Sequence, residues 1–64
     1  MLKLTEVRKA QGLSMSALAR KAELHVSTVS LIENGRLKPY PGQREKLAKA
    51  LGMEDREDEL FEEV

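Results

Sequence analysis

Apolar residues recur at helical spacing in five short segments of this 64-residue chain. The first stripe lies at Leu4, Val7 and Ala10 and predicts a helix over about residues 2–11 that stops at Gly12. The apolar positions of the later segments are Leu18, Ala19 and Ala22, then Val29 and Ile32, then Leu47, Ala48, Ala50 and Leu51, and finally Leu60 and Phe61. The pattern therefore predicts an all-α fold of five short helices.

Residues that begin or end helices lie between these segments. Ser14 is a good N-cap for the second helix, and His25 stands at the position where the third helix should be capped. Asn34 and Gly35 form a C-cap pair that ends the third helix. Pro41 suits the first turn of the fourth helix. Tight turns between the helices are expected throughout.

The last part of the chain, after Gly52, is strongly acidic. Residues 55–62 are predicted to form the fifth helix, because Asp and Glu are favourable near the positive end of a helix. Leu60 and Phe61 should dock this helix on the rest of the domain.

The length and composition predict one small domain over residues 1–64. There is no Cys, so neither a disulfide nor a cysteine-based zinc site can staple the fold, and with one Phe, one Tyr and no Trp its core must be aliphatic. The start of the chain alternates charged and apolar residues and has no long apolar run, unlike a signal peptide or a membrane span. A cytoplasmic protein without membrane association is therefore the default expectation.

Positive and negative charges are unevenly distributed, although the net charge is zero. Residues 1–38 carry seven Lys or Arg and three Glu, a net charge of +4, whereas residues 39–64 carry four Lys or Arg and eight acidic residues, a net charge of −4. This asymmetry indicates a basic binding surface and an acidic surface on another side of the molecule.

No group of residues suggests catalysis. The chain has one His, no Cys, no carboxylate pair in a plausible cleft and no Gly-rich phosphate loop. The acidic run of residues 54–59 lacks the alternating oxygen ligands and the Gly of a calcium loop. The sequence therefore predicts a protein that is not an enzyme and has no metal or other cofactor.

Residues 15–34 have the spacing of a helix-turn-helix, in which two helices cross steeply at a tight turn. Ala19 is small enough for the crossing, and four residues later Glu23 stands where the turn needs a left-handed backbone that Gly usually supplies. Leu24 then fills the turn. An ordinary helical hairpin in a small bundle would satisfy the same spacing, so the flanking residues decide between the two.

Those flanks extend the pattern over nearly the whole chain. In order, the matching positions are Leu4, Val7, Arg8, Gly12, Leu13, Ser14, Leu18, Ala19, Leu24, Ser27, Thr28, Val29, Ser30, Ile32, Glu33, Gly35, Pro39, Ala48, Ala50, Leu51 and Gly52. In these positions the chain resembles the lambda-repressor-like family of bacterial and phage regulators, also called Cro/CI or XRE type. The resemblance implies a compact five-helix domain and a transcriptional regulator, a repressor, that binds double-stranded DNA sequence-specifically as a homodimer on paired half-sites.

The resemblance also implies which residues contact DNA, with a recognition helix over about residues 26–34 in the major groove. The candidates for phosphate contact are Ser14, Met15 and Ser16 at the start of the second helix, and Arg36 and Lys38 after the third. The candidates for base contact are Val26, Ser27, Thr28 and Leu31. Arg36 and Lys38 could instead be solvated loop charges, and His25 is interpreted as a cap rather than a base-reading residue.

A structural ion pair is implied as well. Members of the family pair an Arg at the position of Arg8 with a Glu at the position of Glu33, partly buried, and the pair orients the recognition helix. The alternatives are two solvated charges, or a pairing of Glu33 with Arg36.

The chain departs from the family pattern at three positions. Met15 stands where members often carry Gln, and Val26 and Leu31 stand where they often carry long polar side chains that read A or G. Valine and leucine can contact only thymine methyl groups. The alternative function is therefore a protein-interaction module, such as an antitoxin or an accessory subunit. Dimer contacts are expected from the Leu37–Tyr40 loop and from the end of the fifth helix with Leu60 and Phe61.

Overall fold

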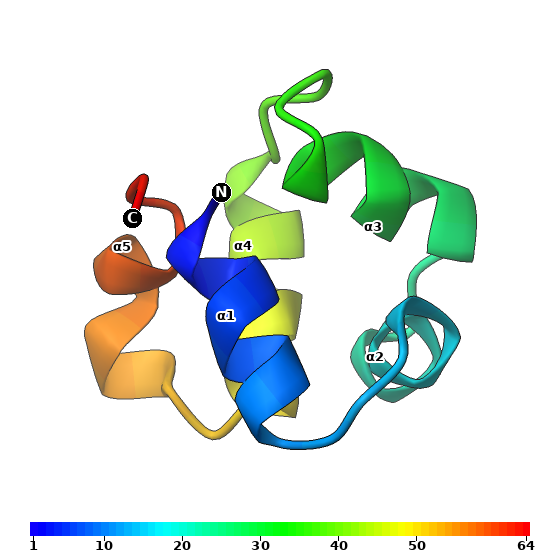
Figure 1. Cartoon of the computed structure of the whole chain (residues 1–64), viewed down its shortest axis with the longest axis horizontal. Helices are drawn as coiled ribbons and strands as arrows, with labels where there is room; N and C mark the ends of the chain where they lie inside the picture. Colours follow the sequence, from blue (N-terminus) through cyan, green and yellow to red (C-terminus); the bar gives the residue numbers. More distant parts are fainter.

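The computed structural model describes residues 1–64, and its regular structure is helical apart from one isolated β-bridge. The elements are α1 (Lys3–Ala10), α2 (Met15–Ala22), α3 (Val26–Glu33), α4 (Pro41–Ala50), the short 3₁₀ helix η1 (Glu54–Arg56) and α5 (Glu57–Leu60), as Figure 1 shows. The predicted all-α fold with five α-helices is confirmed.

Every α-helix contributes to one aliphatic core. Leu4 of α1, Leu18 of α2, Val29 of α3, Leu47 of α4 and Leu60 of α5 have no accessible surface. Burying such a side chain contributes roughly 1.5–3 kcal/mol relative to leaving it exposed. The stability of the domain therefore depends on helix packing, as the lack of Cys required.

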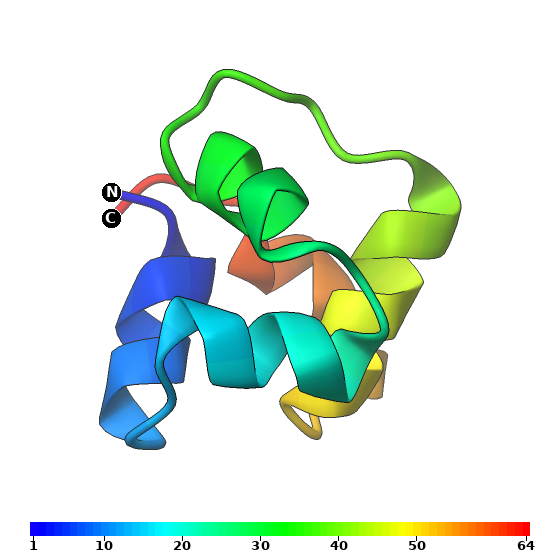
Figure 2. The ribbon, with the colours of Figure 1, turned by 90° about the vertical axis from the view of Figure 1, so that its right-hand side faces the viewer.

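Helices α2 and α3 cross steeply, as a helix-turn-helix requires. In Figure 1 α2 is seen end-on while α3 runs across the view, and in Figure 2 α2 runs across while α3 is seen end-on. Ala19 and Ala22 are buried on the inner side of α2, where only a small side chain allows a second helix to approach closely. The crossing predicted for residues 15–34 is thus present.

The turn between these helices contains the one non-glycine residue with a positive φ. Glu23 has φ 58° and ψ 43°, and the Leu24 N–H donates to the Ala19 carbonyl at 2.8 Å to close the turn. The side chain of Leu24 packs against the core. The predicted left-handed turn at Glu23 is confirmed.

The predicted helix ends agree with the structure at α2 and α3. The Ser14 hydroxyl accepts a hydrogen bond from the Ala17 N–H at 3.0 Å, and Gly35, with φ 73°, follows Asn34 at the end of α3. His25 occupies the N-cap position of α3, but its side chain makes no capping hydrogen bond. His25 is therefore the N-cap residue of α3, as predicted, but it caps the helix without a side-chain hydrogen bond.

The outer helices are shorter than predicted, because the two ends of the chain pair with each other. Leu2 and Glu63 form an antiparallel β-bridge, and the Lys3 N–H donates to the Glu62 carbonyl at 2.9 Å. In both ribbon views the termini lie side by side (Figure 2). Residues 61–64 consequently leave the helix that was expected to reach residue 62, and α1 begins only at Lys3.

The packing of the last helix also corrects the expected dimer contacts. Leu60 is fully buried in the core and cannot contact a second copy without unfolding α5. Phe61 is only half-buried, and the guanidinium carbon of Arg44 lies 4.7 Å from the centre of its ring. Phe61 thus remains accessible, whereas Leu60 belongs to the core.

Candidate nucleic-acid interface

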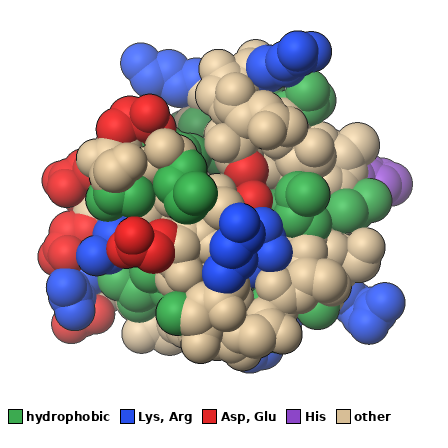
Figure 3. Space-filling model, viewed as in Figure 1, with side chains coloured by type: hydrophobic (Ala, Val, Ile, Leu, Met, Phe, Trp, Pro, Cys, Tyr) green, Lys and Arg blue, Asp and Glu red, His purple; other side chains and the backbone are tan.

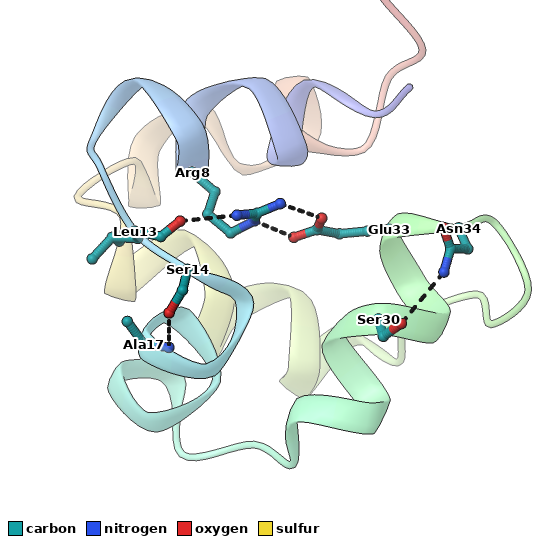
Figure 4. Close-up of polar contacts among 7 residues, drawn as sticks. All are labelled: Arg8, Leu13, Ser14, Ala17, Ser30, Glu33 and Asn34. Carbon is teal, nitrogen blue, oxygen red and sulfur yellow. Dashed lines mark hydrogen bonds and ion pairs between the residues drawn. The ribbon is translucent and has the colours of Figure 1, made fainter.

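The position of α3 is fixed by a buried ion pair at its C-terminal end. Arg8 Nε donates to Glu33 Oε2 at 2.7 Å, Arg8 Nη2 donates to Glu33 Oε1 at 3.0 Å, and Arg8 Nη1 donates to the Leu13 carbonyl at 2.9 Å. The side chains of Arg8 and Glu33 are only 9% and 6% exposed. Figure 4 shows Arg8 reaching from α1 to Glu33 with the chain before α2 at its other side. One guanidinium thus joins α1, the α1–α2 connection and the end of α3.

The start of α2 presents backbone donors rather than long side chains. The Ser14 hydroxyl is occupied as the cap, and the N–H groups of Met15 and Ser16 come before the first residue that can bond within the helix. The Met15 side chain packs against the core. Of the three phosphate-contact candidates here, Met15 can therefore contribute only its backbone.

The loop after α3 carries two cations without partners in the protein. Arg36 and Lys38 are exposed and form no ion pair within the domain. The loop itself is held against α3, because the N–H groups of Arg36 and Leu37 donate to the Leu31 carbonyl at 2.9 and 3.2 Å. The loop therefore holds free positive charge next to α3, and the alternative pairing of Glu33 with Arg36 does not form.

The outer side of α3 is accessible at all four base-contact candidates. Val26 is 46% exposed and Leu31 41% exposed, Ser27 is exposed and Thr28 is partly exposed. The structure therefore leaves all four candidates at least partly accessible on α3.

Three other polar side chains on α3 or at its ends were not among the predicted base contacts. His25 is exposed directly before Val26 with no capping bond, and the Asn34 amide donates to the Ser30 hydroxyl at 3.3 Å (Figure 4). Sequence spacing could have identified Ser30 and Asn34, because they are one helical turn apart. Whether the His25 side chain forms a capping hydrogen bond depends on its rotamer, and the sequence carries no signal for this rotamer.

The acidic residues lie on another part of the molecule. Figure 3 shows red side chains gathered on the left, where Figure 1 places α5, and blue side chains at the top, where Figure 1 places the loop after α3. The acidic group consists of Glu54, Asp55, Glu57, Asp58 and Glu59. The charge asymmetry of the sequence therefore has a counterpart in space.

The helices and side chains of the structure were also compared with the requirements of a metal site and of a membrane span. No group of three or more His, Cys, Asp or Glu side chains is arranged to hold a metal ion. None of the helices combines the length and the apolar character needed to cross a membrane.

The comparisons with known proteins agree with this geometry. Residues 2–61 match the sequence pattern of a family described as "Helix-turn-helix domain". No curated protein and no solved structure matches the chain. The family match spans all five helices, including the steep α2–α3 crossing and the Arg8–Glu33 pair that supports it. The chain belongs to the helix-turn-helix domain family, in agreement with its lambda-repressor-like pattern.

Proposed function

We propose that this protein is a sequence-specific regulator of transcription, a repressor, that inserts α3 into the major groove of double-stranded DNA. The observation that carries the proposal is the accessible outer side of α3, held in position by the buried Arg8–Glu33 pair and flanked by a loop with two free cations. The role is one of binding, without catalysis.

The proposed phosphate contacts come from both sides of α3. The N–H groups at the start of α2 favour an anion, because the positive end of the helix dipole lies there. Arg36 and Lys38 would contact the neighbouring phosphates by charge. Contacts of this kind position the protein but carry no direct sequence information.

The proposed base contacts are of two chemical kinds. Ser27 and Thr28 would hydrogen-bond to base edges, and Val26 and Leu31 would contact thymine methyl groups. Neither a long amide nor a guanidinium lies among these four residues. Discrimination at each base should therefore be at the low end of the ~1–3 kcal/mol typical of a good bidentate contact.

A binding titration tests this division of roles. Replacing each thymine of a bound site in turn by uracil removes only the methyl group, and the positions next to Val26 or Leu31 should lose affinity. Ser27→Ala should lose affinity at specific positions, whereas Lys38→Ala should weaken binding about equally on all sequences and reduce the salt slope by about 1. Lys46→Ala on α4 is the matched control. If neither uracil nor Ser27→Ala has an effect, α3 does not read bases.

The proposed regulator acts as a homodimer. Two copies would place their recognition helices in successive major grooves, about 34 Å apart. The loop Leu37–Tyr40 offers the contact, since Tyr40 is 68% exposed. Sedimentation uses less protein than is needed to fill a DNA duplex of two half-sites. A homodimer should then give duplexes that carry either two copies or none, whereas Tyr40→Asp should give duplexes that carry a single copy.

A second candidate function is a protein-interaction module, such as an antitoxin or an accessory subunit. The apolar side chains of Val26 and Leu31 favour it, because exposed apolar residues commonly mark partner-binding surfaces. The salt dependence separates the two functions. Regulator affinity for DNA falls steeply and log-linearly with salt, whereas an interaction module binds DNA weakly at every salt concentration.

A further inference from the structure

A pocket of about 410 Å³ lies between the loop after α3, the start of the chain and α5. In both ribbon views the first part of this loop lies close to the N-terminal end of the chain. The apolar part of the lining includes Leu2, Leu37, Pro39 and Phe61, and the charged part is Lys38 and Arg44. No acidic residue lines the pocket, although the chain has as many acidic as basic residues.

The two cations of the pocket differ in how far they are neutralised. Arg44 Nη2 lies 2.7 Å from Asp58 Oδ1, and Arg44 Nε lies 3.3 Å from Glu57 Oε2. Lys38 is exposed and has no ion-pair partner. The pocket therefore combines half-buried apolar walls with one uncompensated positive charge at its rim.

We propose that this pocket binds a small organic carboxylate with an apolar body. The carboxylate would contact the Lys38 ammonium group, and the body would cover Leu2, Leu37 and Phe61. The volume lies within the range of about 300–1,000 Å³ that is usual for small-molecule sites. A compact inorganic anion would leave the apolar walls in contact with water, so it fits this lining less well.

Binding there has a consequence for the DNA interface, and this consequence rests on the proposed function. Lys38 is also a proposed phosphate contact. A carboxylate that engages its ammonium group removes one such contact, so the ligand should lower the affinity for DNA. The site would thus make DNA binding responsive to a metabolite of this chemical class.

The first experiment uses the DNA-free protein, so its outcome does not depend on DNA binding. Octanoate is titrated into the labelled protein and followed by NMR, with 1-octanol as the neutral control. Octanoate should produce saturable shifts at Leu2, Leu37 and Phe61, with affinity well above that of 1-octanol. Lys38→Gln should weaken octanoate binding roughly fivefold, as expected for one exposed charge pair, while Lys46→Gln should not. No saturable shift, or equal affinity for octanoate and 1-octanol, overturns the proposal.

The second experiment measures DNA affinity with and without saturating octanoate. Wild-type protein should bind DNA more weakly in its presence. Leu2→Phe, which enlarges a lining residue outside the loop after α3, should remove both the NMR shifts and this effect. An unchanged DNA affinity of the octanoate-saturated protein overturns the regulatory part, while a protein that binds octanoate but no DNA refutes only the proposed function.

Discussion

Two Arg–Glu pairs in this domain have nearly the same geometry and very different surroundings. Arg8 and Glu33 form two hydrogen bonds of 2.7 and 3.0 Å, and Arg56 and Glu59 form two of 2.9 and 2.8 Å. The side chains of the first pair are 9% and 6% exposed, and those of the second are 57% and 42% exposed. The comparison teaches that burial, rather than hydrogen-bond geometry, decides what each pair does for the fold.

The difference follows from what water would do if one partner were removed. At the surface, water solvates the remaining charge, so the pair contributes little. In the interior, water cannot solvate the remaining charge. Removing one partner there lowers the free energy of unfolding by an amount on the order of 3–5 kcal/mol. Because a small domain has a total stability of only about 5–15 kcal/mol, removing one partner of the buried pair would cost a large part of that stability.

The largest expected effect comes from breaking the buried pair. Arg8→Met and Glu33→Gln should each lower the free energy of unfolding by roughly 3–5 kcal/mol, because each leaves a buried partner unpaired. The double variant should lose much less than the sum of the two. Urea unfolding of the wild type, the two single variants and the double variant gives the coupling energy by a double-mutant cycle.

The exposed pair supplies the matched control for this cycle. Arg56→Met and Glu59→Gln, alone and together, should leave the urea midpoint almost unchanged. Additive losses at Arg8 and Glu33, or losses of equal size at the two pairs, would show that burial does not distinguish them.

The turn at Glu23 extends the comparison from side chains to the backbone. A substitution there is expected to stabilise the fold, and by less than the loss of a buried charge destabilises it. The turns at Gly12, Gly35 and Gly52 use glycine at φ 73°, whereas Glu23 adopts φ 58°. Glu23→Gly should therefore raise the free energy of unfolding by up to roughly 1 kcal/mol. Glu23→Ala retains Cβ and should bring no such gain. A thermal melt that shows destabilisation by glycine would mean that the backbone at this turn is not strained.

The smallest expected effect concerns the pH dependence of the exposed pair. The hydrogen bond from Arg56 lowers the pKa of the Glu59 carboxyl group, and the same bond raises the pKa of Arg56. Since the folded pKa of Glu59 lies below the unfolded value, its small contribution is present above the unfolded pKa and is lost as the pH falls through the folded pKa. In an NMR titration, Arg56→Gln should move the Glu59 pKa upward. An unmoved midpoint would show that the pair does not persist in solution.

The features that could be predicted from the sequence are those set by neighbouring residues. Helical periodicity, the Ser14 cap and the Gly35 helix end depend on a few adjacent positions, so each could be recognised locally. The Arg8–Glu33 pair joins residues 25 positions apart. It was expected only because the whole pattern resembles a known family, and spacing alone left both side chains as solvated charges.

The features that could not be predicted depend on how distant helices meet. The Gln11 side-chain amide donates to the Leu51 carbonyl at 2.9 Å and so links the end of α1 to the end of α4. Leu60 is buried rather than free for dimer contact, because α5 packs its apolar side inward. For the candidate site, the family resemblance was enough to propose the four side chains of α3 as base contacts, but nothing in the sequence indicated the pocket beside Lys38. Its walls come from the start of the chain, the loop after α3 and α5.

The bridge between Leu2 and Glu63 holds the two ends of the chain together, so the order of the helices along the chain could be changed without changing how they pack. The two ends lie within backbone hydrogen-bond distance, since the Val64 N–H donates to the Met1 carbonyl at 2.8 Å. A short peptide that joined residue 64 to residue 1 would therefore close the chain into a ring without displacing a helix. New ends could then be opened in the exposed turn at Gly52. The same helices would occur in a different order along such a permuted chain, and the surface formed by α2, α3 and the following loop would remain intact.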